Sequence, residues 1–542
     1  MLAITAAGVG PLARLSVGCC GSAASLATLK GGRNWELLGR TAGLALSVAA
    51  GATCLGTFLG YRLGATAWRG KALFRIMLLV PLAIPPYLHA VGWTTLLGPE
   101  GTATASLATL LRVVPTAITA ALYSFGGAVF VLTLAYFPVA AFFAEKALAW
   151  SSPALVDAAR VFGANSWQVF WAARWPQLRT GVASAAMIIF LLAASDLGVP
   201  TLLKVPVFNT EVFTQLSAFN DVATASALTV PLILIGLLLV RVERRVTLGE
   251  FRSDGADVQP PRPSFPGQGR VNVALFVLLM AFAVGLPVGA IVQAADPEAA
   301  RRMAALSWAP MLNSFRYAGI AAALIVVLST ILAGLLRGAP HRLCTVTDAV
   351  IITTFAVPST IVALALLTVF GRQPWASWLD ASTLVVAALV LRYLIVGYRI
   401  VGGAMEQIPA DLLEAAGLDG AGALRRMWHI VIPQLRLALL AALGATFILG
   451  LAEIGSTILL YPPGGETLLI AMLSIEANSP RAYVAALMLL ELLPLIGILV
   501  LSLSRIGLGE RVSRVVVKRP VGPGTPNWLI GAGLTVLAAY AG

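Results

Sequence analysis

Charged residues are scarce in this sequence. Asp, Glu, Lys and Arg make up 11% of its 542 residues, whereas soluble globular proteins carry about 25%. Hydrophobic residues make up 59%, and the mean hydropathy is +0.89. This composition excludes a disordered chain and differs from that of an ordinary soluble domain. We therefore predict an all-α polytopic membrane protein.

Cysteine and histidine are also rare. The four cysteines show no CxxC spacing, and the three histidines lie far apart without an HExxH pattern. These absences exclude a disulfide scaffold and argue against a metal site of His and Cys. The net charge of +13 first suggests nucleic acid as a partner. Most of the basic residues, however, stand in short loops between apolar runs, so we expect membrane lipid and no nucleic acid.

Long apolar runs are abundant. Runs that approach the roughly 20 residues needed to cross a bilayer lie near 41–61, 73–97, 124–145, 181–203, 223–240, 271–293, 315–336, 346–370, 383–402, 436–460 and 483–503. Residues 1–26 are a weaker candidate, and 527–541 form a possible extra span. Lys and Arg concentrate in alternate loops, which places those loops in the cytoplasm. We expect about twelve transmembrane helices.

The chain repeats itself. At an offset of 257 residues, Pro176-Gln177-Leu178-Arg179 falls on Pro433-Gln434-Leu435-Arg436, and Tyr136 falls on Tyr393. Further upstream the offset becomes 273, which places the kink residue Pro85 on Pro358 and implies 16 extra residues between about 87 and 135. We predict two parallel six-span halves, 1–250 and 271–510, joined by a Pro- and Gly-rich cytoplasmic linker at 251–270 and followed by a tail at 511–542.

Each half contains one long cytoplasmic loop with the same pattern of an acid, two alanines, a glycine and a proline. The first copy consists of Asp157, Ala158, Ala159, Gly163 and Pro176, and the second of Glu414, Ala415, Ala416, Gly420, Ile430 and Pro433. This pattern resembles the EAA-x3-G-x9-I-x-L-P loop of the permease subunits of bacterial ABC importers. The first copy departs from it by Asp for Glu, Ala173 for Ile and Trp175 for Leu, and the second has Ile432 for Leu.

The resemblance implies a type I ABC importer permease of the bacterial inner membrane. In that family the two loops, here about 150–178 and 407–435, couple the permease to ATPase subunits, and we call them the coupling loops. We expect two ATPase copies that hold ATP and Mg, and a periplasmic or lipid-anchored substrate-binding protein. This chain itself should hold no cofactor and no catalytic residue, because its nearest approach to a P-loop, Gly70-Lys71-Ala72, lacks the following Ser or Thr.

The loop residues suit this task physically. The early acid favours a helix N-terminus, and the paired alanines allow another surface to approach closely. The glycine allows the backbone to leave the short helix at an angle that other residues resist. The proline is expected to start the next long helix.

Two acids occupy equivalent positions inside the apolar runs. Asp196 and Glu453 are each followed by an apolar residue and a glycine. As hard oxygen ligands they are candidates for a cation pathway. The alternative is a helix-end or gating pair that is hydrogen-bonded to neighbouring helices. Arg392 is interpreted as a helix-packing or helix-end charge.

The fusion of two such halves most resembles the iron(III) importer permeases, with thiamine permeases as relatives. Iron(III) is therefore the expected substrate. Thiamine or another small solute, such as a phosphonate, a polyamine or an oxyanion, is the alternative within this class. A secondary transporter is the alternative outside it, although that class offers no reason for two ordered coupling loops.

Overall fold

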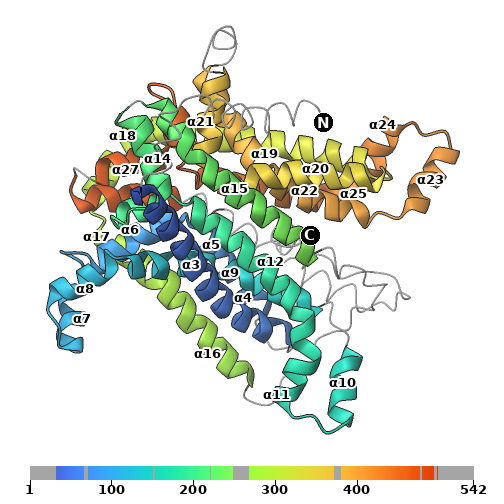
Figure 1. Cartoon of the computed structure of the whole chain (residues 1–542), viewed down its shortest axis with the longest axis horizontal. Helices are drawn as coiled ribbons and strands as arrows, with labels where there is room; N and C mark the ends of the chain where they lie inside the picture. The colour runs from blue at the N-terminus through green and yellow to red at the C-terminus, as the bar shows by residue number, and fades with distance from the viewer. Residues whose placement is uncertain are drawn as a thin grey trace.

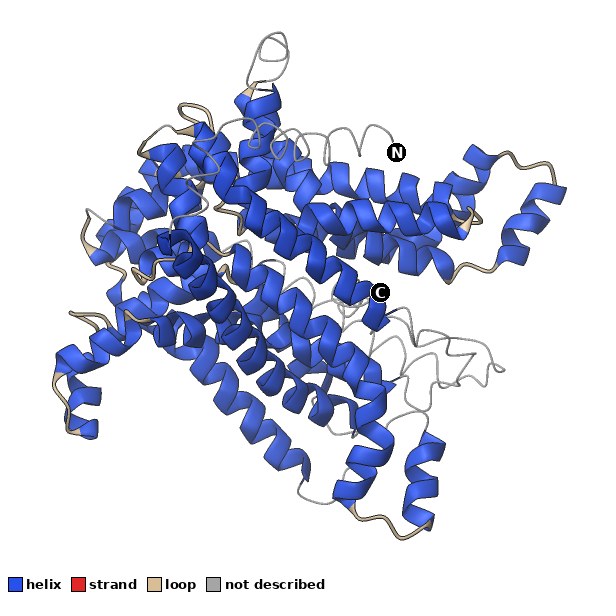
Figure 2. Cartoon of the chain, viewed as in Figure 1, coloured by secondary structure: helices blue, strands red, loops and turns tan. Residues whose placement is uncertain are grey.

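The computed structural model describes residues 32–65, 71–149, 153–219, 221–247, 268–370, 380–476 and 479–492, together with residue 497. The candidate spans 1–26 and 527–541, the tail 511–542 and nearly all of the linker 251–270 lie outside these residues. Within them the chain is built from helices and connecting loops (Figure 2). The all-α prediction is therefore confirmed for this part of the chain.

The first half runs from α3 to α15 (Figure 1). Its helices are α3 (Gly32–Ala65), α4 (Lys71–Met77), α5 (Leu79–Ala83), α6 (Pro86–Leu97), α7 (Thr104–Leu111), α8 (Pro115–Leu122), α9 (Phe125–Ala149), α10 (Pro153–Val161), α11 (Ser166–Val169), the π-helix η1 (Phe170–Arg174), α12 (Trp175–Ser195), α13 (Gly198–Leu202), α14 (Phe208–Ser217) and α15 (Val222–Thr247).

The second half begins at α16, and the last three residues of the predicted linker belong to that helix. Its helices are α16 (Gln268–Met280), the π-helix η2 (Ala281–Gly285), α17 (Leu286–Ala294), α18 (Pro297–Leu306), α19 (Trp308–Leu336), α20 (His341–Ala356), α21 (Ser359–Phe370), α22 (Ala381–Glu406), α23 (Ala410–Leu418), α24 (Ala423–Arg426), the π-helix η4 (Met427–Val431), α25 (Ile432–Leu451), α26 (Thr457–Leu460) and α27 (Leu468–Glu476).

Seven helices in the described residues are long and apolar enough to cross a membrane, or up to ten if each sharply bent pair is one span. Two of the predicted spans are bent pairs, and the bends lie at the predicted kink residues. The helix over 73–97 turns by 85° before Pro86, and that over 346–370 turns by 102° before Ser359. Both breaks contain a proline, Pro85 and Pro358, at which the helical hydrogen-bond ladder loses a donor. The total of twelve spans stays a prediction.

The two halves repeat each other helix by helix. At the 257 offset α9 corresponds to α22 and α12 to α25, and at the 273 offset α3 corresponds to α19. The 16 extra residues fall between α6 and α9. Two short helices, α7 and α8, occupy this insertion and turn by 111° at their junction. Figure 1 shows them beside the first half, at the end of the molecule opposite α10 and α23.

Small residues set the distance between the two central helices of each half. Along α3, Gly56 and Gly60 face α9, and a Cβ atom at Gly56 would lie 2.7 Å from the Cβ of Ala140. In the second half the glycine is on α22 instead of α19. Gly397 of α22 stands at the position of Ala140, and Ser329 of α19 stands at the position of Gly56. A Cβ atom at Gly397 would lie 2.7 Å from the Ser329 hydroxyl. In both halves the close approach of the two helices therefore requires a glycine at the same crossing point.

The halves also interlock. One apolar core contains Leu44, Phe137 and Ile189 of the first half and Phe276 and Met488 of the second. The other core contains Leu364 and Leu389 of the second half together with Phe208 and Leu228 of the first. Each half therefore completes its core with side chains from the other, so the two halves form one packed unit.

Candidate functional site: the coupling loops and the seam between the halves

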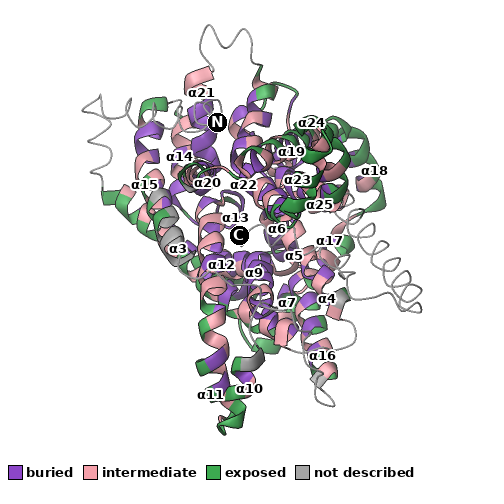
Figure 3. Cartoon of the chain, turned by 90° about the vertical axis from the view of Figure 1, so that its right-hand side faces the viewer, coloured by how far each residue is buried: buried purple, intermediate pink, exposed green. Residues whose placement is uncertain are grey.

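The two coupling loops fold alike. Each consists of a nine-residue helix, a turn, a four-residue helix and a five-residue π-helix that continues into a long helix: α10, α11, η1 and α12 in the first half, and α23, α24, η4 and α25 in the second. Both helix pairs project from the same end of the molecule (Figure 1). Seen from that end, they are largely exposed (Figure 3).

Gly163 and Gly420 end the nine-residue helices in the same way. Their φ angles are +80° and +79°, in the left-handed region that L-residues with a Cβ atom avoid. The residue after each glycine donates its N–H to a carbonyl five residues back, Ala164 to Ala159 at 3.0 Å and Ala421 to Ala416 at 2.9 Å. This is the Schellman arrangement, and it supports the role predicted for the glycines.

The acids and alanines lie on the exposed helices, but the acids are not in the first turn. Asp157 and Glu414 are each the fifth residue of a nine-residue helix, so the interaction with the helix N-terminus that we expected does not apply. Asp411 is the acid in the first turn of α23. Glu414, Ala158 and Ala415 are exposed, whereas Asp157, Ala159 and Ala416 are half-buried.

As predicted, each proline lies in the first turn of its long helix: Pro176 is the second residue of α12 and Pro433 is the second residue of α25. Neither helix follows a loop, however, because each continues from a π-helix. In the first loop the helix begins after Asn165, whose side chain accepts from the Gln168 N–H at 2.9 Å, and it runs on through η1 to Pro176. In the second loop Pro433 follows η4 in the same way. A proline inside a regular helix clashes with the carbonyl four residues back. The wider π-turn before each proline relieves that clash.

Different contacts hold the two helix pairs in the same shape. In the first loop Val156, Val169 and Ala173 form a small buried cluster. In the second loop these positions are Leu413, Arg426 and Ile430, and Arg426 donates a hydrogen bond to the Leu413 carbonyl at 3.2 Å. Ala173, which departs from the family pattern, is therefore accommodated by its own local packing.

Large apolar side chains are exposed at matching positions of the two loops. Leu155 and Leu412 are 54% and 41% exposed, and Val161 and Leu418 are 84% and 90% exposed. Trp167 with Leu424 and Trp171 with Trp428 continue the match. We call these eight residues the paired apolar surfaces. Their exposure has no signature in the sequence, although the 257 offset aligns them. We interpret this repeated exposure at equivalent positions of the two loops as a contact surface.

Gly420→Ala is expected to destabilise the turn of the second loop by about 1–2 kcal/mol, because alanine resists the left-handed backbone. Protease cleavage of this loop should then accelerate about 5- to 30-fold, since cleavage follows the open population. Gly422→Ala is the matched control. Gly422 has φ −63° and ψ 163°, and an added Cβ would have no neighbour within 4 Å. Equal cleavage of the two variants would contradict this prediction.

Asp196 and Glu453 lie where long helices stop, between α12 and α13 and between α25 and α26. Asp196 accepts the Val199 N–H at 2.9 Å and is hydrogen-bonded by Tyr136. Glu453 accepts the Ser456 N–H at 3.1 Å and the Tyr393 hydroxyl at 2.6 Å. Both acids thus cap the following turn and bind the equivalent tyrosine.

Arg392 completes this cluster. Its Nε lies 3.1 Å from Glu453 Oε2, and both side chains are 5% exposed. The arrangement favours the interpretation as a helix-end pair over a site that binds a cation, because the Glu453 carboxylate is already paired with an arginine. The pathway role of the two acids stays a prediction. Within the described ranges no group of three or more His, Cys, Asp or Glu side chains could hold a metal ion.

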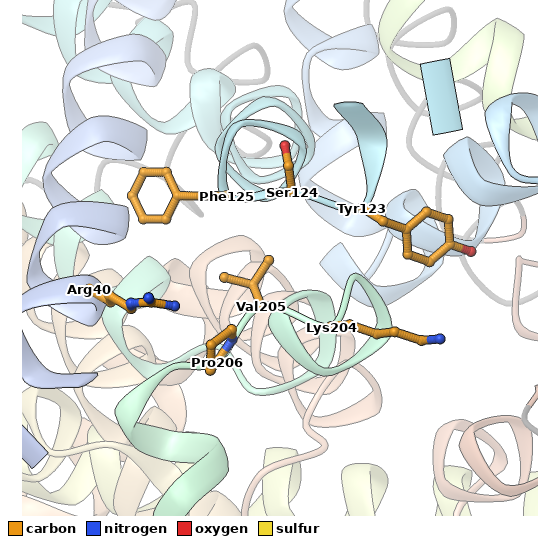
Figure 4. A pocket seen from close by; sticks show the side chains of 7 residues that line it. All are labelled: Arg40, Tyr123, Ser124, Phe125, Lys204, Val205 and Pro206. Carbon is orange, nitrogen blue, oxygen red and sulfur yellow. The ribbon is translucent and has the colours of Figure 1, made fainter. Parts of the chain in front are cut away.

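A cavity of about 420 Å³ lies in the first half, away from these features. It is lined by Arg40, Tyr123, Ser124, Phe125, Lys204, Val205 and Pro206 (Figure 4). In this view Arg40 extends toward the other lining residues, whereas the amine of Lys204 points away from Arg40. The two cations therefore do not converge on one ligand position, and none of the predicted site residues lines the cavity.

Residues 330–507 match the family described as the binding-protein-dependent transport system inner membrane component. This segment includes the second coupling loop and Glu453. The chain is therefore a multi-pass inner membrane protein whose second half is similar to this family.

Curated proteins extend the similarity into the first half. The chain is 24% identical over 434 residues to the ferric transport system permease protein FbpB of Actinobacillus pleuropneumoniae, covering 73% of this chain and 59% of that protein. It is 27% identical over 205 residues to the Fe(3+)-transport system permease protein FbpB 2 of Haemophilus influenzae, covering 38% and 36%. It is 28% identical over 231 residues to the inner membrane ABC transporter permease protein YdcU of Escherichia coli, covering 40% and 73%.

Proposed function

We propose that this chain is the permease subunit of an ATP-driven ABC importer that moves iron(III) into the cytoplasm. The observation that carries this proposal is the pair of equivalent, exposed coupling loops at one end of the molecule. A secondary transporter has no use for two such surfaces. The ferric transport names of relatives that align over both halves support iron(III) over thiamine or another small solute.

The partners follow from the two loops. Two ATPase subunits, which hold ATP and Mg, bind one to each loop, and closure of the ATPase pair moves α10 and α23. The rigid Schellman turns and the π-turns transmit this movement to α12 and α25, whose far ends carry Asp196 and Glu453. A periplasmic or lipid-anchored protein delivers the substrate at the opposite end. The transport subunit itself catalyses no reaction.

Uptake of labelled iron(III) under iron limitation tests this proposal. Cells lacking the gene, and cells carrying Asp157→Arg with Glu414→Arg, are both expected to lose uptake. The control is Glu36→Arg with Glu298→Arg, because these side chains are 61% and 70% exposed and the charge change is the same but lies outside the loops. This control should keep normal iron uptake. Normal iron uptake in the deletion strain would redirect the proposal to thiamine or another solute. Normal uptake in the double loop variant would refute the coupling role.

A further inference from the structure

Arg392 in α22 is buried and binds three helix ends at once. Its Nε is paired with Glu453 Oε2 at 3.1 Å. Its Nη1 donates to the Val357 carbonyl at 3.1 Å, and its Nη2 donates to the Ser195 hydroxyl oxygen at 2.8 Å. Ser195 ends α12, Val357 ends α20 before the sharp bend, and Glu453 follows α25.

One of these contacts crosses the seam between the halves. Ser195 belongs to the first half, and its hydroxyl donates to the Leu191 carbonyl at 2.8 Å. The serine oxygen is therefore available to accept the bond from Arg392. In the first half the position equivalent to Arg392 is Ala135, which is buried. The tyrosines and acids of the two halves are therefore arranged alike, but the arginine that bonds across the seam is present in the second half alone.

The charges make this contact strong. Arg392 interacts electrostatically with Glu453 and with Asp196, the neighbour of Ser195 in the first half. Charge-assisted hydrogen bonds are roughly twice as strong as neutral ones, and water cannot readily replace them at a buried site. Any movement that separates α12 from α22 must break the bond between Arg392 and Ser195.

We propose that Arg392 is a latch across the seam: its bond to Ser195 holds the halves together in the resting state and breaks in each transport cycle. Arg392 is thus a positioning residue that couples movement of the first half to the helix ends of the second. This role rests on the proposed transport function, because only a transport cycle requires the seam to open.

Ser195→Ala is the sharpest test, because it removes the contact across the seam and leaves the pair of Arg392 and Glu453 intact. Loss of one charge-assisted bond should shift the equilibrium toward separated halves by about tenfold. In the full complex in proteoliposomes, ATP hydrolysis without the binding protein should rise by a similar factor, and iron imported per ATP should fall. Arg392→Lys keeps the charge but loses the three-way geometry, and should show the same phenotype.

Thr446→Ala is the matched control. Thr446 is 1% exposed, and its hydroxyl donates to the Ala442 carbonyl within its own helix at 2.7 Å. This variant loses a buried hydroxyl without touching the seam, and should hydrolyse ATP like the wild type. If Thr446→Ala raised ATP hydrolysis as much as Ser195→Ala, the effect would be due to general destabilisation, and the latch would be overturned.

A second readout needs no transport. Spin labels at Arg160 and Arg425, in the full chain with its native cysteines replaced, report the distance between the coupling loops. Ser195→Ala should broaden this distance distribution or shift it to longer values. An unchanged distribution together with unchanged ATP hydrolysis would overturn the latch. If the wild type imports no iron while the distances change, the proposed substrate fails and the latch stands.

Discussion

The double substitution Leu412→Asp and Leu418→Asp is expected to lower the number of ATPase subunits bound per chain from two to one. Both side chains belong to the paired apolar surfaces, and Leu418 is 90% exposed. Burial of a leucine contributes about 1.5–3 kcal/mol, so losing both weakens binding at this loop by about 100-fold or more. The first loop keeps Leu155 and Val161 and should still bind one ATPase subunit.

Stoichiometry of the purified complex, measured by its mass in solution, checks this prediction. Adding Leu155→Asp and Val161→Asp should remove the second ATPase subunit as well. Leu306→Asp is the control, because Leu306 is 72% exposed on α18, at the opposite end of the molecule (Figure 1). Two ATPase subunits retained by the quadruple variant would exclude these surfaces as the docking sites.

Gly60→Val is expected to cause a large loss of stability. A Cβ atom at this position would overlap the Ala141 carbonyl oxygen and would lie 2.8 Å from the Cβ of Ala144. Because both obstacles belong to α9 and one is backbone, α3 and α9 must separate along their length. Overpacking typically costs about 1–3 kcal/mol, and valine at a backbone contact should reach the upper end of that range.

Thermal unfolding of the purified chain in detergent measures this effect. Gly39→Val is the control in the same helix, since an added Cβ at Gly39 would have no neighbour within 4 Å. It should unfold close to the wild-type temperature. Equal unfolding temperatures for the two variants would show that the close crossing of α3 and α9 is not required for stability.

Much of the architecture follows from local sequence. Apolar length predicts the long helices, and the repeated register predicts that the two coupling loops share one fold. The kink residues Pro85 and Pro358 indicate where two spans bend, because proline interrupts the helical ladder wherever it stands. Gly163 and Gly420 indicate where the short helices of the coupling loops end, because glycine tolerates positive φ values.

Other features could not be read from the sequence. The prolines of the coupling loops lie at the starts of α12 and α25 as predicted, but the sequence does not reveal that a π-helix joins each long helix to the short helix before it. The small residues of the spans were compatible with close packing or with ordinary membrane composition. Only the crossing of α3 with α9 shows that Gly56 faces Ala140, because a contact between distant segments has no local signature.

The sequence by itself determined the membrane class, the internal repeat and the coupling loops, since hydropathy, register and backbone preference are properties of neighbouring residues. The tertiary structure decided what the isolated charges do. Arg392 is 197 positions from Ser195, and its counterpart in the repeat is an alanine, so neither periodicity nor symmetry could pair them. Burial at the seam brought them together, because a charge in an apolar interior must find partners wherever the fold provides them.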